Sequence, residues 1–200
     1  MKPSKEGFFV SAMMKDFFNL PKDLPAPHDD GAADHLEGMS LPSLVLHTTE
    51  DREVNIRNLA KQPTIIFFYP RTGVPNEPVP EGWDMIPGAR GCTPQSCGFR
   101  DLHQEFKTLG YAVFGASTQT TEFQQEFVER NHIPFEILSD EDLALTEALE
   151  LPTFEFNGET LIKRMVLILE NEKIEKVFYP VFPPDKNAEV VLDWIQSQLK

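Results

Sequence analysis

Cys92 and Cys97 are the only two cysteines among the 200 residues, and they lie five positions apart. A Pro/Gly-rich segment, residues 71–91, ends directly before Cys92, and Thr93-Pro94 after it is typical of the start of a helix. Unpaired N–H groups and the helix dipole stabilise a thiolate there, and the thiolate is the nucleophilic form of cysteine. We therefore predict that Cys92 is a reactive nucleophile, with Arg90 and Arg100 as candidate cationic neighbours.

The spacing between the two thiols limits how they can react with each other. On an ideal helix, five residues correspond to about 140° of rotation and about 7.5 Å of rise, so the Cα atoms are about 8–9 Å apart. A disulfide tolerates about 7 Å at most. A Cys92–Cys97 disulfide therefore requires the first helical turn to unwind, which suits a cycle in which oxidised Cys92 waits to be resolved.

The elements that must position these thiols can be followed along the chain. A β-branched and aromatic run at 64–69 predicts a buried strand before the long loop, and apolar spacing predicts a helix over 93–110. Further along, the patterns predict strands at 111–116 and 135–138, helices at 121–131 and 142–149, a hairpin of 164–169 with 173–178, and a closing helix at 187–199. This order is typical of the thioredoxin fold, an α/β architecture in which helices flank both faces of a central mixed β-sheet.

The chain divides into two parts by composition. Residues 1–40 are polar and rich in proline, apart from a Phe/Met pattern at 8–18 that suits one amphipathic helical face. We predict an N-terminal arm over residues 1–40 and one thioredoxin-fold domain over residues 41–200, because this length suits a single domain.

Composition excludes several classes of function. The formal net charge of −14 disfavours nucleic acids and anionic membranes as partners. We find no apolar run of the roughly 20 residues that a membrane span needs and no signal-peptide pattern, so we predict a cytoplasmic protein with reduced thiols. The five histidines show no metal-ligand spacing and no Gly-rich phosphate loop is present, so we predict neither a metal nor a cofactor.

The segment from Gly91 to Asp101, GCTPQSCGFRD, resembles the peroxiredoxins, and most of all their bacterioferritin-comigratory or Q-type branch. The resemblance extends over roughly residues 40–199 and includes Phe68-Tyr69-Pro70 before the loop, Leu138-Ser139-Asp140, and Arg164 at the start of a strand. It implies that Cys92 is the peroxidatic cysteine, Cys97 the resolving cysteine, and Arg164 the arginine beside the thiolate.

One departure from the family pattern concerns the peroxide pocket. The pattern P-x-x-x-T/S-x-x-C places a hydroxyl three residues before the cysteine, where this chain has Ala89. Pro70 lies 22 residues before Cys92, so a segment from Val74 to Arg90 is inserted. We expect Thr72 to supply the missing hydroxyl if the loop folds back, and the insertion to wall the pocket or form a contact surface. Tyr69 and Gln95 are further candidate pocket members.

The resemblance implies a thiol peroxidase that reduces hydrogen peroxide and organic hydroperoxides through a Cys92 sulfenic acid. Thioredoxin or a similar dithiol protein would reduce the resulting disulfide, and the chain would be a monomer or a homodimer. Two alternatives stay open on the same fold. One is a thiol–disulfide oxidoreductase, although C-x-x-C is absent, and the other is a non-catalytic redox sensor or binding module.

Overall fold

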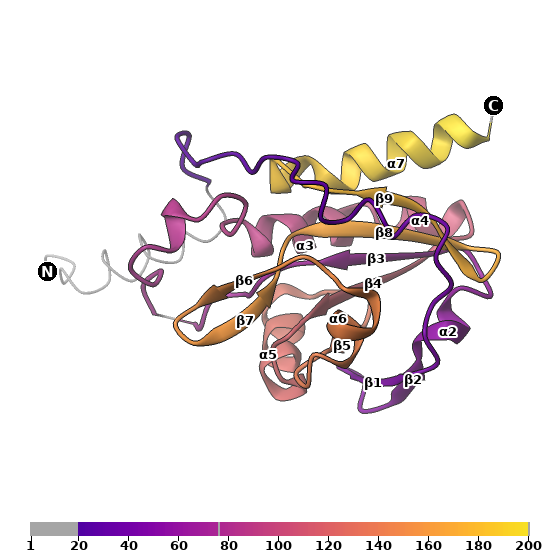
Figure 1. The fold of residues 1–200 in the computed structure, drawn as a ribbon, viewed down its shortest axis with the longest axis horizontal. Coiled ribbons are helices and arrows are strands. Elements are labelled where there is room, and N and C mark those ends of the chain that lie inside the picture. The colour runs from indigo at the N-terminus through magenta and orange to yellow at the C-terminus, as the bar shows by residue number, and fades with distance from the viewer. Residues whose placement is uncertain (1–19, 76, 200) are drawn as a thin grey trace, which may run out of the picture.

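The computed structural model describes residues 20–75 and 77–199. Its centre is a seven-stranded mixed sheet in the order β2-β1-β5-β4-β3-β8-β9 (Figure 1). β3 pairs in parallel with β4 and antiparallel with β8, and β4 pairs in parallel with β5. The strands are β1 (Val45–Thr48), β2 (Glu53–Asn55), β3 (Thr64–Phe68), β4 (Ala112–Ser117), β5 (Ile137–Ser139), β8 (Met165–Glu170) and β9 (Lys173–Phe178).

Both faces of the sheet are covered, because side chains of the central strand β3 alternate between two apolar clusters. Ile65 and Phe67 point into one cluster with side chains of α3 (Cys92–Asp101), α4 (His103–Thr108), α5 (Thr121–Asn131) and α7 (Asn187–Gln198). Ile66 and Phe68 point into the other, with side chains of α2 (Ile56–Leu59) and α6 (Ala144–Leu149). The predicted α/β architecture, a mixed sheet between helices, is therefore confirmed.

Two differences between the structure and the predicted elements bear on the region around Cys92. The helix predicted over 93–110 is divided at Leu102, where ψ is 10°, into α3 and α4. A separate hairpin of β6 (Thr153–Phe156) and β7 (Glu159–Ile162) was not predicted, although Asn157 and Gly158 take the positive φ values that two-residue hairpin turns need. In Figure 1 this hairpin projects from the main sheet on the side where the inserted loop lies.

The described part of the predicted arm, residues 20–40, packs on the domain. Leu36 is fully buried in the cluster beneath α2 and α6. The Gly38 amide donates to the Ile174 carbonyl at 2.8 Å, and Ser40 forms a β-bridge with Lys173. This segment thereby covers part of the edge strand β9. The amphipathic pattern at 8–18 lies outside the described residues, and the boundary at residue 40 stays a prediction.

Candidate active site

Cys92 is the first residue of α3, two positions earlier than in the helix capped by Thr93 that the sequence indicated. Gly91, not Thr93, is the N-cap residue, with φ of 105°, and a Cβ at Gly91 would lie 2.3 Å from Cγ of Pro184. Only glycine satisfies both the backbone conformation and this close approach. The Cys92 thiol, 5% exposed, therefore lies at the positive end of the helix dipole.

Arg164 provides a cation beside this sulfur. It lies between β7 and β8, is 3% exposed, and its Nη2 is 3.3 Å from Sγ of Cys92. Carbonyl groups of the inserted segment hold the guanidinium in place: Nε donates to Gly88 at 3.3 Å, and Nη2 donates to Ala89 at 3.0 Å and Arg90 at 3.2 Å. A fixed guanidinium favours a thiolate and can orient a peroxide oxygen.

Gln95 connects Arg164 to the C-terminal helix. Its Oε1 accepts a hydrogen bond from Nη1 of Arg164, and its Nε2 donates to Oδ1 of Asn187, in the first turn of α7, at 2.8 Å. All three side chains are buried. Gln95 therefore positions the arginine without lining the pocket in front of the sulfur.

The loop after β3 folds back, so that Thr72 lines the same pocket as Cys92. The Thr72 amide and hydroxyl donate to Oε1 of Gln119 at 2.8 and 3.1 Å, and Nε2 of Gln119 donates to the Thr72 carbonyl at 3.2 Å. Because the hydroxyl proton is directed at Gln119, the Thr72 oxygen keeps acceptor capacity toward the pocket. The role of Gln119 was not predicted, but it follows β4, the parallel neighbour of the strand that precedes Thr72.

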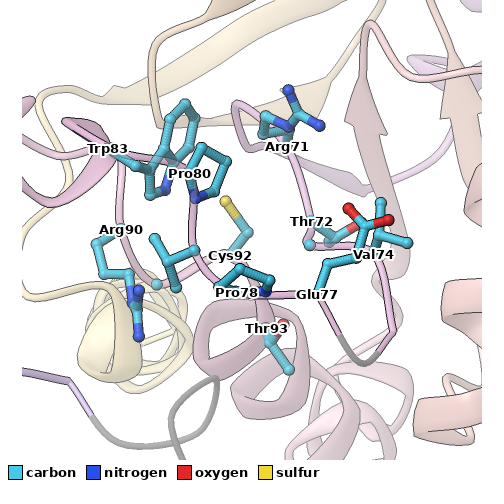
Figure 2. A pocket seen from close by; sticks show the side chains of 13 residues that line it. Arg71, Thr72, Val74, Glu77, Pro78, Pro80, Trp83, Arg90, Cys92 and Thr93 are labelled. Carbon is cyan, nitrogen blue, oxygen red and sulfur yellow. The ribbon is translucent and has the colours of Figure 1, made fainter. Parts of the chain in front are cut away.

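The inserted segment forms most of the pocket in front of the sulfur. Figure 2 shows the Cys92 sulfur pointing into a space bounded by Pro80 and Trp83 on one side and by Arg71 and Thr72 on another. Arg71, which sequence reasoning did not single out, forms an ion pair with Glu159 of β7 at 2.8 Å. The pocket volume is about 60 Å³.

The two other arginines near the motif have different surroundings. Arg90 lines the pocket and pairs with Asp84 at 3.0 Å. Arg100 pairs with Asp101 and donates to the Asn131 carbonyl, and its charge acts on Cys97. Arg164 is thus the arginine whose side chain contacts the Cys92 sulfur. Tyr69 packs in the same apolar cluster as Cys92 and does not line the pocket.

Cys97 is a buried free thiol, 8% exposed, on the same intact helix. Burial raises the pKa of the Cys97 thiol above its usual range, which keeps it protonated and unreactive while α3 is folded. The first turn is held by the bond from the Gln95 amide to the Gly91 carbonyl, 3.0 Å, and by the bond from the Ser96 hydroxyl to the Cys92 carbonyl, 3.0 Å. Both thiols are present unjoined in this conformation.

The acidic cluster at 139–142 has a structural role. Both carboxylate oxygens of Asp140 accept hydrogen bonds from the backbone amides of Leu145 and Thr146 at 2.8 Å, at the start of α6.

Within residues 20–75 and 77–199, no group of three or more His, Cys, Asp or Glu side chains is placed to hold a metal ion. None of the helices in this described part is long and apolar enough to cross a membrane.

Comparisons with known proteins agree with the geometry. The redoxin family model matches residues 36–192. Over 160 residues the chain is 31% identical to peroxiredoxin Bcp of Escherichia coli K12, covering 78% of this chain and 92% of that protein. It is 29% identical over 162 residues to chloroplastic peroxiredoxin Q of Sedum lineare, covering 80% of this chain and 78% of that protein.

Solved structures show the same fold. Peroxidoxin BcpB from Mycobacterium tuberculosis superposes with a TM-score of 0.65 at 23% identity, covering 81% of this chain and 97% of that one. A structure of Xanthomonas campestris peroxiredoxin Q gives a TM-score of 0.64 at 23% identity, covering 82% and 99%.

Proposed function

Because the chain belongs to the redoxin family and is a peroxiredoxin, a thiol-dependent peroxidase, we propose that Cys92 is its peroxide-attacking thiolate and Cys97 its resolving thiol. The observation that carries this assignment is the 3.3 Å contact between Nη2 of Arg164 and Sγ of Cys92 at the first residue of α3. Helix dipole and guanidinium act together on one sulfur, in a pocket that a small molecule can enter.

The first step transfers one oxygen atom. The Cys92 thiolate attacks one peroxide oxygen, the O–O bond breaks, and a sulfenic acid forms while hydroxide or alkoxide leaves and takes up a proton. The sulfur is oxidised and the peroxide is reduced by two electrons. Arg164 stabilises the charge that moves from sulfur to the leaving oxygen, and the Thr72 oxygen accepts a hydrogen bond from the peroxide, a role supported by its position in the pocket lining.

The second step forms the disulfide. The first turn of α3 unwinds, the Cys97 thiol loses its proton, and the resulting thiolate attacks the Cys92 sulfenic acid; the S–O bond breaks and the leaving hydroxide takes up a proton to give water. A dithiol protein then reduces the disulfide by thiol–disulfide exchange. We further propose a thioredoxin-like reductant, hydrogen peroxide and organic hydroperoxides as substrates, a cytoplasmic location, and a monomer or homodimer.

Mass spectrometry of the peroxide-treated protein tests the two cysteine roles. We expect wild type to form one intramolecular Cys92–Cys97 disulfide, Cys97→Ser to stop at an oxidised Cys92, and Cys92→Ser to leave Cys97 reduced. Wild-type peroxide consumption by Cys92→Ser would overturn the assignment.

Two activity assays separate the peroxidase from the alternative readings. With a thioredoxin reducing system a peroxidase turns over continuously, whereas a sensor is oxidised once and stops. Fast reduction of insulin disulfides would instead identify a thiol–disulfide oxidoreductase.

A further inference from the structure

The inserted segment has an architecture that the chemistry at Cys92 does not require. Its side chains form a wall of the pocket in front of the sulfur, with Pro80 and Trp83 on the side away from Thr72 and Val74 beside Thr72 (Figure 2). The wall is mostly apolar: it consists of Val74, Pro78, Val79, Pro80 and Trp83, together with the charged Glu77. Trp83 is the largest of these side chains and is only 5% exposed.

The space left by this wall is small. Its volume of about 60 Å³ compares with about 340 Å³ for the pocket between Pro87 and Tyr179, so the space in front of the sulfur is the narrower of the two. The two oxygens of hydrogen peroxide fit this space. A hydroperoxide whose carbon next to the oxygens is branched or carries an aromatic ring would have to fit that carbon between the sulfur and the wall.

Contacts on its outer side prevent the wall from moving easily. Trp83 packs against the β6–β7 hairpin, with ring centroids 4.9 Å from Phe156 in an edge-on arrangement and 6.1 Å from Phe154. Leu161 of the same hairpin, 2% exposed, completes this separate apolar cluster with Ala89. Packed side chains of this kind resist displacement because each shift opens a void or a clash elsewhere.

The inner side of the wall is fixed to the reactive centre. Backbone hydrogen bonds from Trp83 to Pro80, from Ile86 to Trp83 and from Ala89 to Ile86, each 3.1–3.2 Å, hold the segment in successive turns. The carbonyls of Gly88, Ala89 and Arg90 then bind Arg164. Any outward movement of the wall would therefore also disturb the arginine beside Cys92.

We propose that Trp83, fixed by the β6–β7 hairpin, is a specificity-determining residue that makes the pocket a size filter, favouring small peroxides over hydroperoxides that are branched or aromatic next to the oxygens. This inference rests on the proposed function of Cys92. It assigns a role to the inserted segment and to the hairpin that supports it, through the shape of the pocket rather than through the chemistry of the sulfur.

The test measures only the first step, so that resolution and the reductant do not contribute. The second-order rate of loss of the Cys92 thiol is followed by rapid quenching and mass spectrometry, with hydrogen peroxide and with cumene hydroperoxide. Trp83→Ala opens the wall, Trp83→Phe keeps an aromatic ring against Phe156 but is smaller, and Trp194→Leu is the matched control. Trp194 packs on Phe178 from α7 and does not line the pocket.

The quantity compared is the ratio of the cumene hydroperoxide rate to the hydrogen peroxide rate. We expect this ratio to rise at least about tenfold in Trp83→Ala and by an intermediate amount in Trp83→Phe, and to equal that of wild type in Trp194→Leu, since a single group in a pocket changes selectivity by about 10–200-fold. If Trp83→Ala fails to fold, Trp83→Phe decides the question.

A ratio that stays constant or falls in the Trp83 variants would overturn the filter while leaving the proposed function intact. Failure of both peroxides to oxidise Cys92 in wild type would instead overturn the proposed function, and the filter with it.

Discussion

Arg164 and Cys92, 72 residues apart in the chain, meet through a 3.3 Å contact between Nη2 and Sγ. The contact exists because antiparallel β8 lies beside β3 in the sheet, so that Arg164, just before β8, lies near the loop that follows β3. The same guanidinium binds three carbonyls of the inserted segment. One side chain thus links the nucleophile, the sheet and the pocket wall.

Replacing Arg164 should impair both reactivity and stability. We expect Arg164→Gln to lower kcat/KM for hydrogen peroxide by at least about 10²-fold, the usual effect of removing one group that stabilises transition-state charge. The free energy of unfolding should fall by about 3 kcal/mol, because buried carbonyls lose their donor. Peroxidase kinetics and urea unfolding measure the two effects.

Arg57→Gln is the matched control, because Arg57 also donates to a backbone carbonyl, that of Leu41, but lies on α2 away from the pocket. Its kcat/KM should stay within a factor of two of wild type. Equal losses in the two variants would contradict the role of Arg164 at the sulfur.

Sequence reasoning predicted those parts of the site that lie in one continuous segment. The position of Cys92 at the start of a helix and the distance constraint on Cys97 follow from spacing and helix geometry, and periodicity predicted most of the sheet. The resemblance, not the local pattern, indicated Arg164, and only the fold brings it to Cys92.

Other features depend on tertiary contacts that one sequence does not display. Gln119 holds Thr72 because their strands are parallel neighbours. The N-cap of α3 is Gly91, where Pro184 from a distant part of the chain leaves no room for a side chain. The β6–β7 hairpin did carry a local signal, since Asn157-Gly158 between aromatic residues is typical of a two-residue turn.

Gly91 should tolerate no side chain. In Gly91→Ala the new Cβ would lie 2.3 Å from Cγ of Pro184, at a φ of 105° that residues with a Cβ disfavour. We expect the free energy of unfolding to fall by about 1–3 kcal/mol and peroxide reduction to slow, because the start of α3 carries Cys92. Thermal unfolding and peroxidase assays on the same samples measure both.

Gly98→Ala, on the same helix, is the matched control. Its Cβ would meet Ala188 at 3.4 Å and its backbone is helical, so stability should stay equal or increase by up to about 1 kcal/mol. Stability losses of the same size in both variants would show that α3 disfavours any added methyl group, and would contradict the argument from Gly91.

The buried Cys97 thiol should react slowly until α3 opens. Because burial raises its pKa, alkylation of Cys97 by iodoacetamide in Cys92→Ser should be far slower at pH 7.5 than alkylation of a free thiol. In urea, which unfolds α3, the alkylation rate of Cys97 should rise to that of a free thiol. The sign for stability follows from the same shift. A thiol whose pKa is higher in the folded state stabilises that state less as pH rises above its unfolded pKa, about 8.5.

We therefore expect the stability of Cys92→Ser to fall more steeply above about pH 8.5 than that of the double variant in which Cys97 is also serine. Chemical unfolding across this pH range measures the difference. Rapid alkylation of Cys97 in the folded protein at pH 7.5 would show that α3 does not shield this thiol.

Thr72 should supply the hydroxyl that the sequence lacks at Ala89. Thr72 lines the Cys92 pocket and its hydroxyl proton is directed at Oε1 of Gln119, so its oxygen is left to accept a hydrogen bond from peroxide. Thr72→Val keeps the shape of the side chain and also keeps the 2.8 Å bond from the residue 72 amide to Gln119. The main loss is then one hydrogen-bonding oxygen in the pocket.

We expect Thr72→Val to lower kcat/KM for hydrogen peroxide by about 10–100-fold, since a lost hydrogen bond that forms in the transition state costs about 1.4–2.7 kcal/mol. Thr72→Ser, which restores the oxygen, should recover activity to within about threefold. Thr118→Val is the matched control, because the Thr118 hydroxyl donates to the Thr160 carbonyl at 3.1 Å outside the Cys92 pocket. If Thr72→Val and Thr118→Val had the same activity as wild type, the prediction for Thr72 would be wrong. The peroxide would then be held by Arg164 and backbone groups alone, and the pocket would work without the hydroxyl that Ala89 lacks.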